Sequence, residues 1–370
     1  MKKKIVISAI NFDSGGPLSI MQDCLSELSR NHTSDYEIIA LVNSKKLYEI
    51  SNIEYIEFPL SKKNWIFRLY YEYIFFYFLS IKIKPDFWLS MHDMTPNVRC
   101  KNRFVYCHNP TPFYKAYKKD IFKNTKTFLF SSFYKYLYRI NIKKNKYVIV
   151  QQDWIRKEFR KFWQLKNVLV AYPKVKLFNF EEVFNENPPI PKKNKIKTFF
   201  YPSFPRPFKN FEIICKAYSL LPQKYQDNCK VNLTIDETLN SYSKNIVEEY
   251  SNFKGINFLG LLSRKQVYEY YNISDCLIFP SKLETWGLPI TEFKATSKPM
   301  FLTKESYAKE TVGEYKDVSF FDINSPEELR DLIIDFIDDT IIYEGNKENK
   351  VEEPYTNGWP QLLNKILINE

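Results

Sequence analysis

Residues 276–313 read CLIFPSKLETWGLPITEFKATSKPMFLTKESYAKETVG. The first four residues and residues 300–303 are apolar, which predicts two short buried strands. Between them lie a loop and a helix that we expect to begin at Pro289, because the missing N–H of proline costs nothing in the first helical turn. A strand, a loop and a helix start in this order leave free backbone N–H groups where an anion can bind. The stretch therefore predicts a βαβ unit with a ligand site at its loop.

Two acidic residues of this stretch, Glu284 and Glu292, are eight positions apart, with Gly287, Leu288 and Pro289 between them. One acid falls in the loop and the other in the first turn of the helix. The composite of PS, Glu, WGLP, Glu and a KP turn into a strand resembles the signature of the retaining sugar-nucleotide-dependent glycosyltransferases of family 4. The alternative is that both acids are exposed residues at the helix end of a βαβ crossover and bind no ligand.

The resemblance implies the α/β GT-B fold, in which two Rossmann-like α/β/α domains enclose a cleft. A chain of 370 residues is also too long for one typical core and suits two domains. We place an acceptor-binding domain at 1–172, a linker rich in Pro and Lys at 173–196, and a sugar-nucleotide-binding domain at 197–352. By resemblance, residues 353–370 form a helix that returns to the first domain, and the pattern of 355–368 is helical.

The charge of the chain is divided unevenly. Residues 1–180 carry 31 Lys and Arg against 14 Asp and Glu, a net charge of +17, which leaves −6 for residues 181–370. The basic half therefore suits an anionic partner. The six cysteines form no CxxC pair, which favours a reduced, cytosolic protein. The most apolar run, 73–81, is far shorter than the ~20 residues that span a bilayer, and the N-terminus has no cleavable signal pattern.

The loop after the first predicted strand, 4–10, contains Gly15 and Gly16 ahead of a helix. A glycine turn between a strand and a helix lets the backbone approach a phosphate or sugar closely. Taken alone the pair is weak evidence, because the dinucleotide motif GxGxxG is absent. The family resemblance implies that this loop lines the cleft between the domains.

Two further predicted strands, 87–90 and 103–107, are each followed by a histidine, His92 and His108. Ligands of α/β proteins bind at this edge of the sheet, although chance placement or structural roles would also explain the pair. His108 in CHNP resembles the family's histidine that reaches the reacting sugar. His92 has a less certain counterpart.

Two segments of the N-terminal half are strongly aromatic. Residues 65–83 predict a helix, which we interpret as a core helix under the sheet in preference to a membrane-facing one. Residues 113–147 hold ten Lys and Arg, one acid and eleven Phe or Tyr. This mixture suits single-stranded nucleic acid, an anionic lipid surface, or a solvated helix pair with an aromatic core face. Because the rest of the chain indicates sugar transfer, lipid ranks above nucleic acid.

The loop after strand 197–201 contains Arg206 and Lys209, directly before a predicted helix. In the family, an Arg and a Lys at this junction neutralise the donor's diphosphate. The usual glycine turn is replaced here by SFPRP, so Arg206 fits the pattern less well than Lys209. Two exposed basic residues in a loop are the alternative.

Elsewhere, Asp153 and Ser263 are predicted N-caps of helices.

The resemblance also implies roles within the site. Glu292 would hold the ribose hydroxyls, Glu284 would meet the hydroxyls of the donor sugar, and His108 and Glu284 would act in catalysis. The sequence has no Asp-x-Asp triplet, and we expect neither a metal nor another cofactor, with a UDP- or GDP-linked sugar as donor substrate. The remaining donor-binding residues implied are Arg206, Lys209, Thr285, Trp286, Gly287 and Leu288, and Gly15 and Gly16 would form the cleft loop.

Together these observations predict a retaining, metal-independent hexosyltransferase. Its acceptor would be a glycan or a lipid-linked saccharide, in the synthesis of O-antigen, capsule or exopolysaccharide. We expect a cytoplasmic enzyme on the inner face of the membrane, held by anionic lipid and with no nucleic-acid partner. A sugar-nucleotide epimerase of similar two-domain fold and a non-enzymatic protein that binds anionic polymers are the alternatives.

Overall fold

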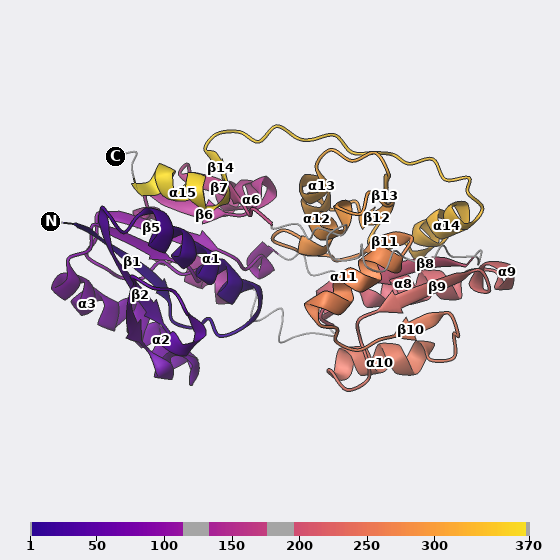
Figure 1. The fold of residues 1–370 in the computed structure, drawn as a ribbon, viewed down its shortest axis with the longest axis horizontal. Coiled ribbons are helices and arrows are strands. Elements are labelled where there is room, and N and C mark those ends of the chain that lie inside the picture. The colour runs from indigo at the N-terminus through magenta and orange to yellow at the C-terminus, as the bar shows by residue number, and fades with distance from the viewer. Residues whose placement is uncertain (1, 114–132, 176–195, 368–370) are drawn as a thin grey trace. The chain divides into compact units, whose positions relative to one another are not determined.

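The structure is a computed structural model that describes residues 2–113, 133–175 and 196–367. The chain divides into two compact units. Unit 1 comprises Met1–Lys174 and Val351–Glu370, and unit 2 comprises Val175–Lys350 (Figure 1). Of the predicted linker 173–196, residues 176–195 lie outside the described residues.

Unit 1 is built on an eight-stranded sheet in the order β14-β7-β6-β5-β4-β1-β2-β3. Every pairing in it is parallel, and Ile5 of the first strand lies between Ile38 and Phe87 of its two neighbours. A parallel sheet needs cover on both faces, which explains the continuous apolar runs of its central strands. The strands are β1 (Lys3–Ala9), β2 (Tyr36–Val42), β3 (Glu54–Glu57), β4 (Phe87–Ser90), β5 (Asn102–Cys107), β6 (Tyr147–Val150), β7 (Val168–Tyr172) and β14 (Tyr355–Asn357).

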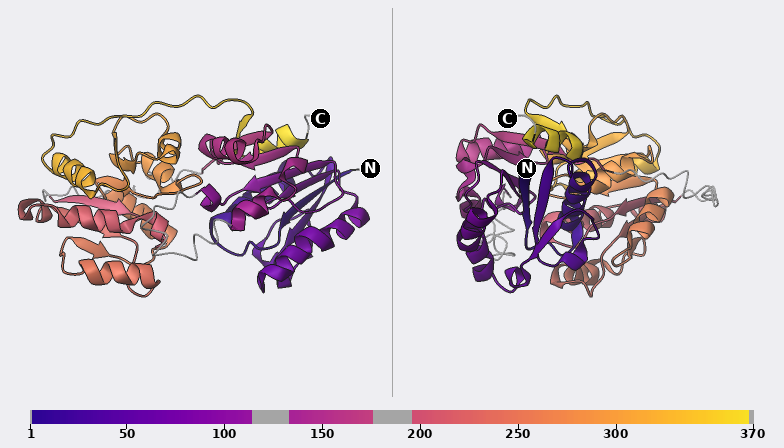
Figure 2. Two further views of the ribbon diagram at one scale, coloured as in Figure 1. Left: turned by 180° about the vertical axis from the view of Figure 1, so that it is seen from behind. Right: turned by 60° about the vertical axis from the view of Figure 1, so that its left-hand side comes forward.

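Helices cover both faces of this sheet (Figure 2). Ile5 and Ile7 point toward one face, where they pack in a core with side chains of the first and last helices. Val6 points to the other face and packs with Phe76. The unit is therefore a three-layer α/β/α domain. Its helical segments are α1 (Gly15–Asn31), α2 (Trp65–Tyr70), the π-helical turn η3 (Tyr71–Phe75), α3 (Phe76–Ile83), α6 (Asp153–Trp163) and α15 (Gly358–Leu367).

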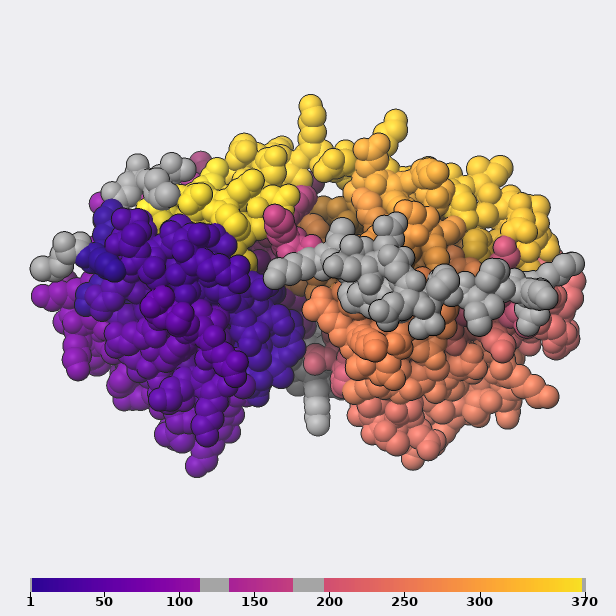
Figure 3. All heavy atoms as spheres, viewed as in Figure 1, coloured from indigo at the N-terminus to yellow at the C-terminus, as the bar shows by residue number. Residues whose placement is uncertain are grey.

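The C-terminal residues complete unit 1. Strand β14 pairs with β7, and Leu362, Leu363, Ile366 and Leu367 of α15 are buried in the core beside α1. In the space-filling view, the yellow C-terminal residues lie against the indigo N-terminal residues of this unit (Figure 3). The prediction of a helix over all of 355–368 is wrong at its start, because the first three residues extend the sheet instead.

Unit 2 is a six-stranded parallel sheet in the order β10-β9-β8-β11-β12-β13. The strands predicted at 276–279 and 300–303 are confirmed, and they lie side by side. The strands are β8 (Lys197–Tyr201), β9 (Cys229–Leu233), β10 (Ile256–Phe258), β11 (Cys276–Phe279), β12 (Met300–Thr303) and β13 (Val318–Phe321). The helices are α8 (Phe211–Ser219), α9 (Gln223–Gln226), α10 (Ser241–Tyr250), α11 (Arg264–Ile273), α12 (Leu288–Lys294), α13 (Ser306–Val312) and α14 (Pro326–Ile337).

One of the two predicted helix caps is confirmed. Ser263 caps α11 in a capping box with Gln266. The prediction for Asp153 is wrong, because Gln152 is the N-cap and Asp153 is the first helical residue. From that position its carboxylate reaches forward to form ion pairs with Arg156 and Lys157.

The aromatic segment 65–83 is helical throughout, as predicted, and one side of it packs in a core cluster on the sheet. Its inner side buries Phe76 and Ser80, whereas Ile66 and Phe78 are exposed. A helix in the outer layer of an α/β/α domain turns one face to the sheet and leaves the other face to solvent. Within the described part of the chain, no helix combines the length and the apolar character that crossing a membrane requires.

The basic and aromatic segment 113–147 is described only in part, because residues 114–132 lie outside the described residues. A helix at 133–139 follows them. Tyr134, Tyr138 and Ile142 enter a core cluster with α6. Part of the aromatic content therefore serves packing in unit 1.

Candidate active site

Two loops of unit 2 are joined at the carboxyl ends of neighbouring strands, β8 and β11. The Lys282 N–H donates to the carbonyl of Phe208 at 2.7 Å, and the Tyr201 hydroxyl donates to the carbonyl of Lys209 at 2.9 Å. Asn210 donates from its side chain to the carbonyl of Pro280 at 3.3 Å. This edge of a parallel sheet is where α/β proteins bind ligands, and the hydrogen bonds hold its two loops in register.

An ion pair joins these loops. The Lys209 ammonium contacts a carboxylate oxygen of Glu284, and their side chains are 17% and 14% exposed. The structure therefore brings together the cation predicted for the diphosphate and the acid predicted for the donor sugar. Partial burial strengthens such a pair, because fewer waters screen it. The remaining exposure leaves both groups within reach of a ligand.

Arg206 is placed differently from Lys209. It precedes the short 3₁₀ turn η6 (Pro207–Lys209), is exposed, and its guanidinium lies 5.8 Å from the ring centroid of Phe204. The structure does not bring Arg206 into the ion pair of Lys209 and Glu284.

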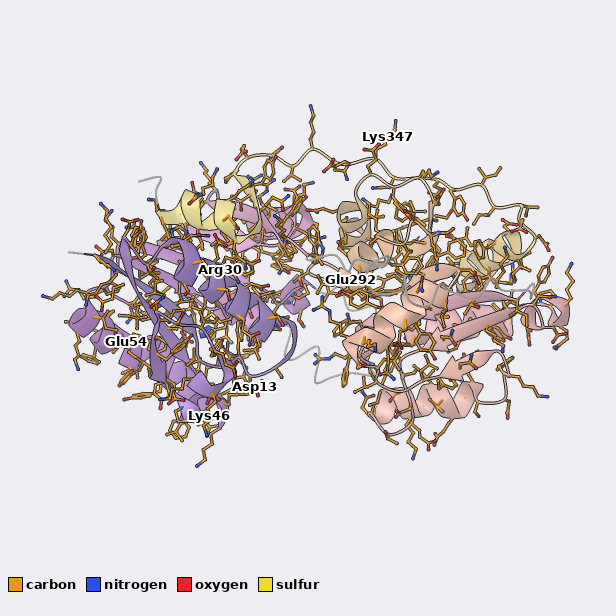
Figure 4. All side chains as sticks on the ribbon, viewed as in Figure 1. Asp13, Arg30, Lys46, Glu54, Glu292 and Lys347 are labelled. Atoms are coloured by element: carbon orange, nitrogen blue, oxygen red, sulfur yellow. The ribbon has the colours of Figure 1, made fainter. Side chains whose placement is uncertain are left out.

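Glu292 lies on α12 (Figure 4). Its carboxylate is held by two tyrosines of α11. The Tyr268 hydroxyl donates to Oε1 at 3.2 Å and the Tyr271 hydroxyl donates to Oε2 at 3.1 Å. The Arg264 guanidinium lies 3.7 Å from Oε1. Burial, followed by the charge of Glu292, raises the pKa of the Tyr271 hydroxyl, which therefore stays protonated and donates. Each carboxylate oxygen of Glu292 is thus fixed by one tyrosine hydroxyl. Its remaining lone pairs can accept hydrogen bonds from a ligand.

The residues between the two acids form a tight turn. Gly287 caps α12 with a φ of +87°, in the left-handed region that favours glycine. The Trp286 indole N–H donates to the Thr291 hydroxyl at 2.9 Å, and the Thr311 hydroxyl donates to the Trp286 carbonyl. Leu288 is exposed and Thr285 is half-buried. Because α12 has only seven residues, its dipole adds little to the cationic side chains.

In unit 1, His108 follows β5 as predicted and has a defined ring environment. Its ring lies 5.5 Å from that of Phe12, in an edge contact, and 4.6 Å from that of Tyr106. Burial lowers the pKa of His108, although the charge of Asp93 acts in the opposite direction. The imidazole is therefore neutral near pH 7 and able to accept or donate one hydrogen bond at each nitrogen.

Asp93 is the residue that holds the segment after β5. Its carboxylate accepts from the backbone N–H of His108 at 2.6 Å and of Asn109 at 3.0 Å. It also accepts from the Tyr138 hydroxyl at 2.9 Å. The polar environment of His108 is thus dominated by a buried carboxylate that accepts from three donors. Such a carboxylate orients the backbone at His108.

His92 lies beneath this segment and is buried, as is its neighbour Glu72 from η3. His92 Nε2 lies 2.7 Å from Glu72 Oε1, and Arg68 donates to the His92 carbonyl at 3.2 Å. Burial raises the pKa of Glu72 to about 8 and lowers that of His92. Both side chains are therefore uncharged at neutral pH, which avoids the cost of burying an ion pair.

Gly15 and Gly16 are the first two residues of α1, whereas they were predicted in the loop that precedes this helix. Gly15 has a φ of +69°. A Cβ at either position would meet no atom within 4 Å. The backbone is therefore open at this turn, and among the described residues no contact requires glycine at position 16.

Several site residues were not found from the sequence. Glu72 was detectable, because it is the only acid in the apolar segment 65–83. Tyr268 and Tyr271 are three apart on a helix, a spacing that puts both on one face, yet nothing marks them as partners of Glu292. Asp93 directly follows His92 in the sequence, but no pattern marks it as the residue that holds the His108 segment. Among the described residues, no group of three His, Cys, Asp or Glu side chains is arranged to hold a metal ion.

Comparison with known proteins extends this description. Residues 182–353 match the family described as Glycosyl transferases group 1. No curated protein matches the chain at a significant level.

Solved structures resemble about nine tenths of the chain. Sucrose-phosphate synthase from Thermosynechococcus elongatus aligns with a TM-score of 0.64 at 11% identity, over 92% of this chain and 90% of that one. The lipopolysaccharide outer core galactosyltransferase WaaB aligns at 0.63 and 12%, over 92% of both chains. HepE from Anabaena, in complex with UDP and glucose, aligns at 0.61 and 13%, over 91% and 90%. These likenesses show the GT-B fold. Residues 182–353 therefore carry the match to the glycosyl transferases group 1 family, and the chain is an enzyme with the GT-B fold.

Proposed function

We propose that this enzyme is a retaining, metal-independent glycosyltransferase that works at the inner face of the cell membrane. It transfers a sugar from a UDP- or GDP-linked donor to a glycan or lipid-linked acceptor during the synthesis of a cell-surface polysaccharide. The observation that carries the proposal is the ion pair of Lys209 and Glu284. It lies inside the family-matched residues, at the sheet edge where a nucleotide sugar would bind.

Two kinds of structural neighbour support the choice of substrates. HepE from Anabaena has been solved with UDP-glucose, and WaaB is a galactosyltransferase of the lipopolysaccharide outer core. The first supports a nucleotide-sugar donor, and the second supports an acceptor of the cell surface.

In this proposal the donor rearranges the ion pair when it binds. The diphosphate carries two negative charges and attracts Lys209, with the exposed Arg206 as a second cation. Glu284 is then released to accept hydrogen bonds from the donor sugar. The carboxylate of Glu292, already oriented by two tyrosine hydroxyls, accepts from the ribose. These cationic side chains are the reason we propose that no metal is needed.

The transfer step breaks the bond between the anomeric carbon and the leaving phosphate oxygen, which keeps the electron pair. The acceptor hydroxyl oxygen forms its bond to the same face of that carbon, and its proton passes to the departing phosphate oxygen. Configuration is thereby retained. Lys209 stabilises the charge that develops on the diphosphate, and neutral His108 accepts or donates a hydrogen bond at the reacting sugar.

A thermal-shift panel of nucleotides and nucleotide sugars tests the proposal. We expect UDP or GDP, and the matching sugar nucleotide, to raise the melting temperature of the full-length protein. Glu292→Ala and Lys209→Ala should abolish that shift. Lys216→Ala and Glu248→Ala, which remove exposed charges from α8 and α10 of the same unit, are matched controls and should leave it intact.

A melting temperature that responds to no nucleotide or sugar nucleotide would contradict the proposal. With the correct donor and acceptor identified, product analysis should show an unchanged anomeric configuration, and transfer should persist in EDTA. Loss of transfer in EDTA, restored by a divalent cation, would contradict metal independence alone.

A further inference from the structure

The helical segment Trp65–Ile83 presents an apolar row to solvent. Its members recur every four residues, with a last interval of three, and all are exposed. Ile66 is 77% exposed and Phe78 is 64% exposed. The outer row consists of Ile66, Tyr70, Ile74, Phe78 and Ile81.

The charged residues of this helix lie on its inner side, which reverses the ordinary pattern of a surface helix. Arg68 and Glu72 are buried, and Lys82 at the end is the remaining charge. The π-turn supplies an extra residue, and Asn97 donates from its backbone to the carbonyl of Glu72 at 2.9 Å. The polar contacts of its inner side therefore fix how the helix is rotated about its own axis. As a consequence, the outer row faces solvent.

The apolar surface continues beyond this helix. Trp65 makes edge contacts with the rings of Phe133 and Tyr134, at centroid distances of 6.0 and 5.8 Å. On the neighbouring helix 133–139 and the residue that follows it, Phe133, Tyr136 and Ile140 are exposed. Contiguous exposed apolar surface of this kind marks a site of protein or membrane contact.

Exposed cations border the surface at both ends. Lys63 precedes the helix, Lys82 lies in its last turn and Lys84 follows it. Arg139 ends the neighbouring helix and Lys143 follows it. Apart from the buried Glu72, residues 59–85 contain no acid, and residues 133–152 contain none. The surface is therefore complementary to an anionic partner.

We propose that this surface docks unit 1 on a lipid bilayer with anionic headgroups. The outer row would lie in the interface with the helix parallel to the membrane plane. Trp and Tyr favour this depth, and the flanking lysines would contact the headgroups. A second copy of the chain is a poorer occupant, because a two-fold contact would place the same cations opposite one another.

The inference deepens the proposed function and rests on it for the lipid-linked acceptor. The helix that docks outward also holds the His92 segment from its inner side, through Arg68 and Glu72. Docking would therefore set the His108 end of the sheet near the membrane that carries the acceptor. Lipid binding itself is measured without donor or acceptor.

Flotation of the full-length protein with vesicles tests the surface. We expect binding to vesicles of phosphatidylcholine with about one third phosphatidylglycerol, weak binding to phosphatidylcholine alone, and loss of binding as salt is raised. Ile74→Glu and, independently, Ile66→Asp should reduce the bound fraction at least tenfold. Lys82→Gln should reduce it about fivefold, the effect of removing roughly one charge at such a surface. Ile342→Glu, at a 91% exposed position of unit 2, is the matched control and should bind as wild type.

Ile74→Trp tells insertion of the outer row into the bilayer from adsorption on its surface. If the row inserts, the fluorescence of this tryptophan should shift to the blue and be quenched by brominated lipid. For each variant, the rise in melting temperature with UDP reports nucleotide binding by unit 2 and does not depend on lipid. A failure of lipid binding is therefore distinguishable from a failure of the proposed chemistry. Wild-type flotation of Ile74→Glu and Ile66→Asp would overturn the inference. So would a solution dimer, seen by sedimentation, that these two variants dissociate.

Discussion

Two tyrosine hydroxyls position the Glu292 carboxylate, and the largely exposed Arg264 guanidinium lies 3.7 Å from its Oε1. Tyr271→Phe removes one donor and keeps the ring, which is buried against Phe293. Because a hydrogen bond to a charged group is worth about 1.5–3 kcal/mol, we expect the Kd for UDP to rise about tenfold or more. Titration calorimetry measures this change.

Tyr270→Phe is the matched control for that experiment. Tyr270 is on the same helix and stacks on Phe200, without a contact to Glu292. It should bind UDP as wild type does. Equal affinity of Tyr271→Phe and Tyr270→Phe would show that Tyr271 serves packing alone.

Glu72 makes the stability of unit 1 depend on pH. Its pKa is raised from 4.5 to about 8 by burial, so the folded protein keeps a proton that the unfolded chain releases. The contribution of protonated Glu72 to the free energy of unfolding is fully present below pH 4.5 and is lost as the pH rises toward 8. The buried histidines have lowered pKa values and act below pH 6.5, with the opposite sign. Between pH 6.5 and 8 we therefore expect the free energy of unfolding to fall, by up to about 2 kcal/mol.

Urea denaturation at a series of pH values checks the expectation. Glu72→Gln cannot ionise, so its unfolding free energy should stay flat between pH 6.5 and 8 even if it is lower throughout. Glu54→Gln, at an exposed acid of the same unit, should keep the wild-type slope. A slope unchanged in Glu72→Gln would assign the pH dependence to another group.

At the scale of single elements, the turn into α12 depends on Gly287. Any other residue there meets the strain of the left-handed region, and a Cβ would lie 3.3 Å from Ile290 Cδ1. We expect Gly287→Ala to lower the free energy of unfolding by about 1–2 kcal/mol. Gly287→Asn should lose less, because Asn tolerates this region.

Denaturant titration of the two variants and of Gly16→Ala measures the effect. Gly16 has an ordinary φ and open space around it, so Gly16→Ala should be as stable as wild type. If Gly287→Ala were equally stable, the turn would have to relax to another conformation.

The strands predicted at 87–90, 103–107, 276–279 and 300–303 match the structure within a residue, and the reason is physical. Both faces of a parallel sheet are buried, so its strands are short apolar runs bounded by polar residues, as at Cys276–Phe279. The orientation of a surface helix carries a weaker signal. In Trp65–Ile83 apolar residues occur on every side, so the sequence alone did not show which face the buried Glu72 selects.

At the scale of the whole molecule, the two-unit GT-B architecture followed from the sequence because one stretch resembled a family, and not from periodicity. The ion pair of Lys209 and Glu284 joins residues 75 apart in sequence, and their roles were predicted separately without the contact. Asp93 was missed because its function lies in backbone hydrogen bonds to His108 and Asn109. Sequence patterns do not record such contacts.

Unit 1 is also closed by residues distant in sequence, and this closure predicts an asymmetric response to truncation. Four aliphatic side chains of α15 are fully buried, each worth about 1.5–3 kcal/mol. Buried Arg156 donates to the carbonyls of Glu352 and Pro354. Together these contacts rival the roughly 5–15 kcal/mol that stabilises a domain.

We therefore expect a chain that ends at Lys350 to lose the cooperative unfolding of unit 1. Unit 2, expressed as residues 175–350, should keep a UDP-induced thermal shift, because Lys209, Glu284 and Glu292 all lie within it. Calorimetry of the truncated chain with and without UDP separates the two transitions. Leu363→Ala in the full chain is the milder companion variant and should cost about 2–5 kcal/mol in unit 1 alone. An unchanged unit 1 transition in the truncated chain would show that the C-terminal residues are accessory to this core.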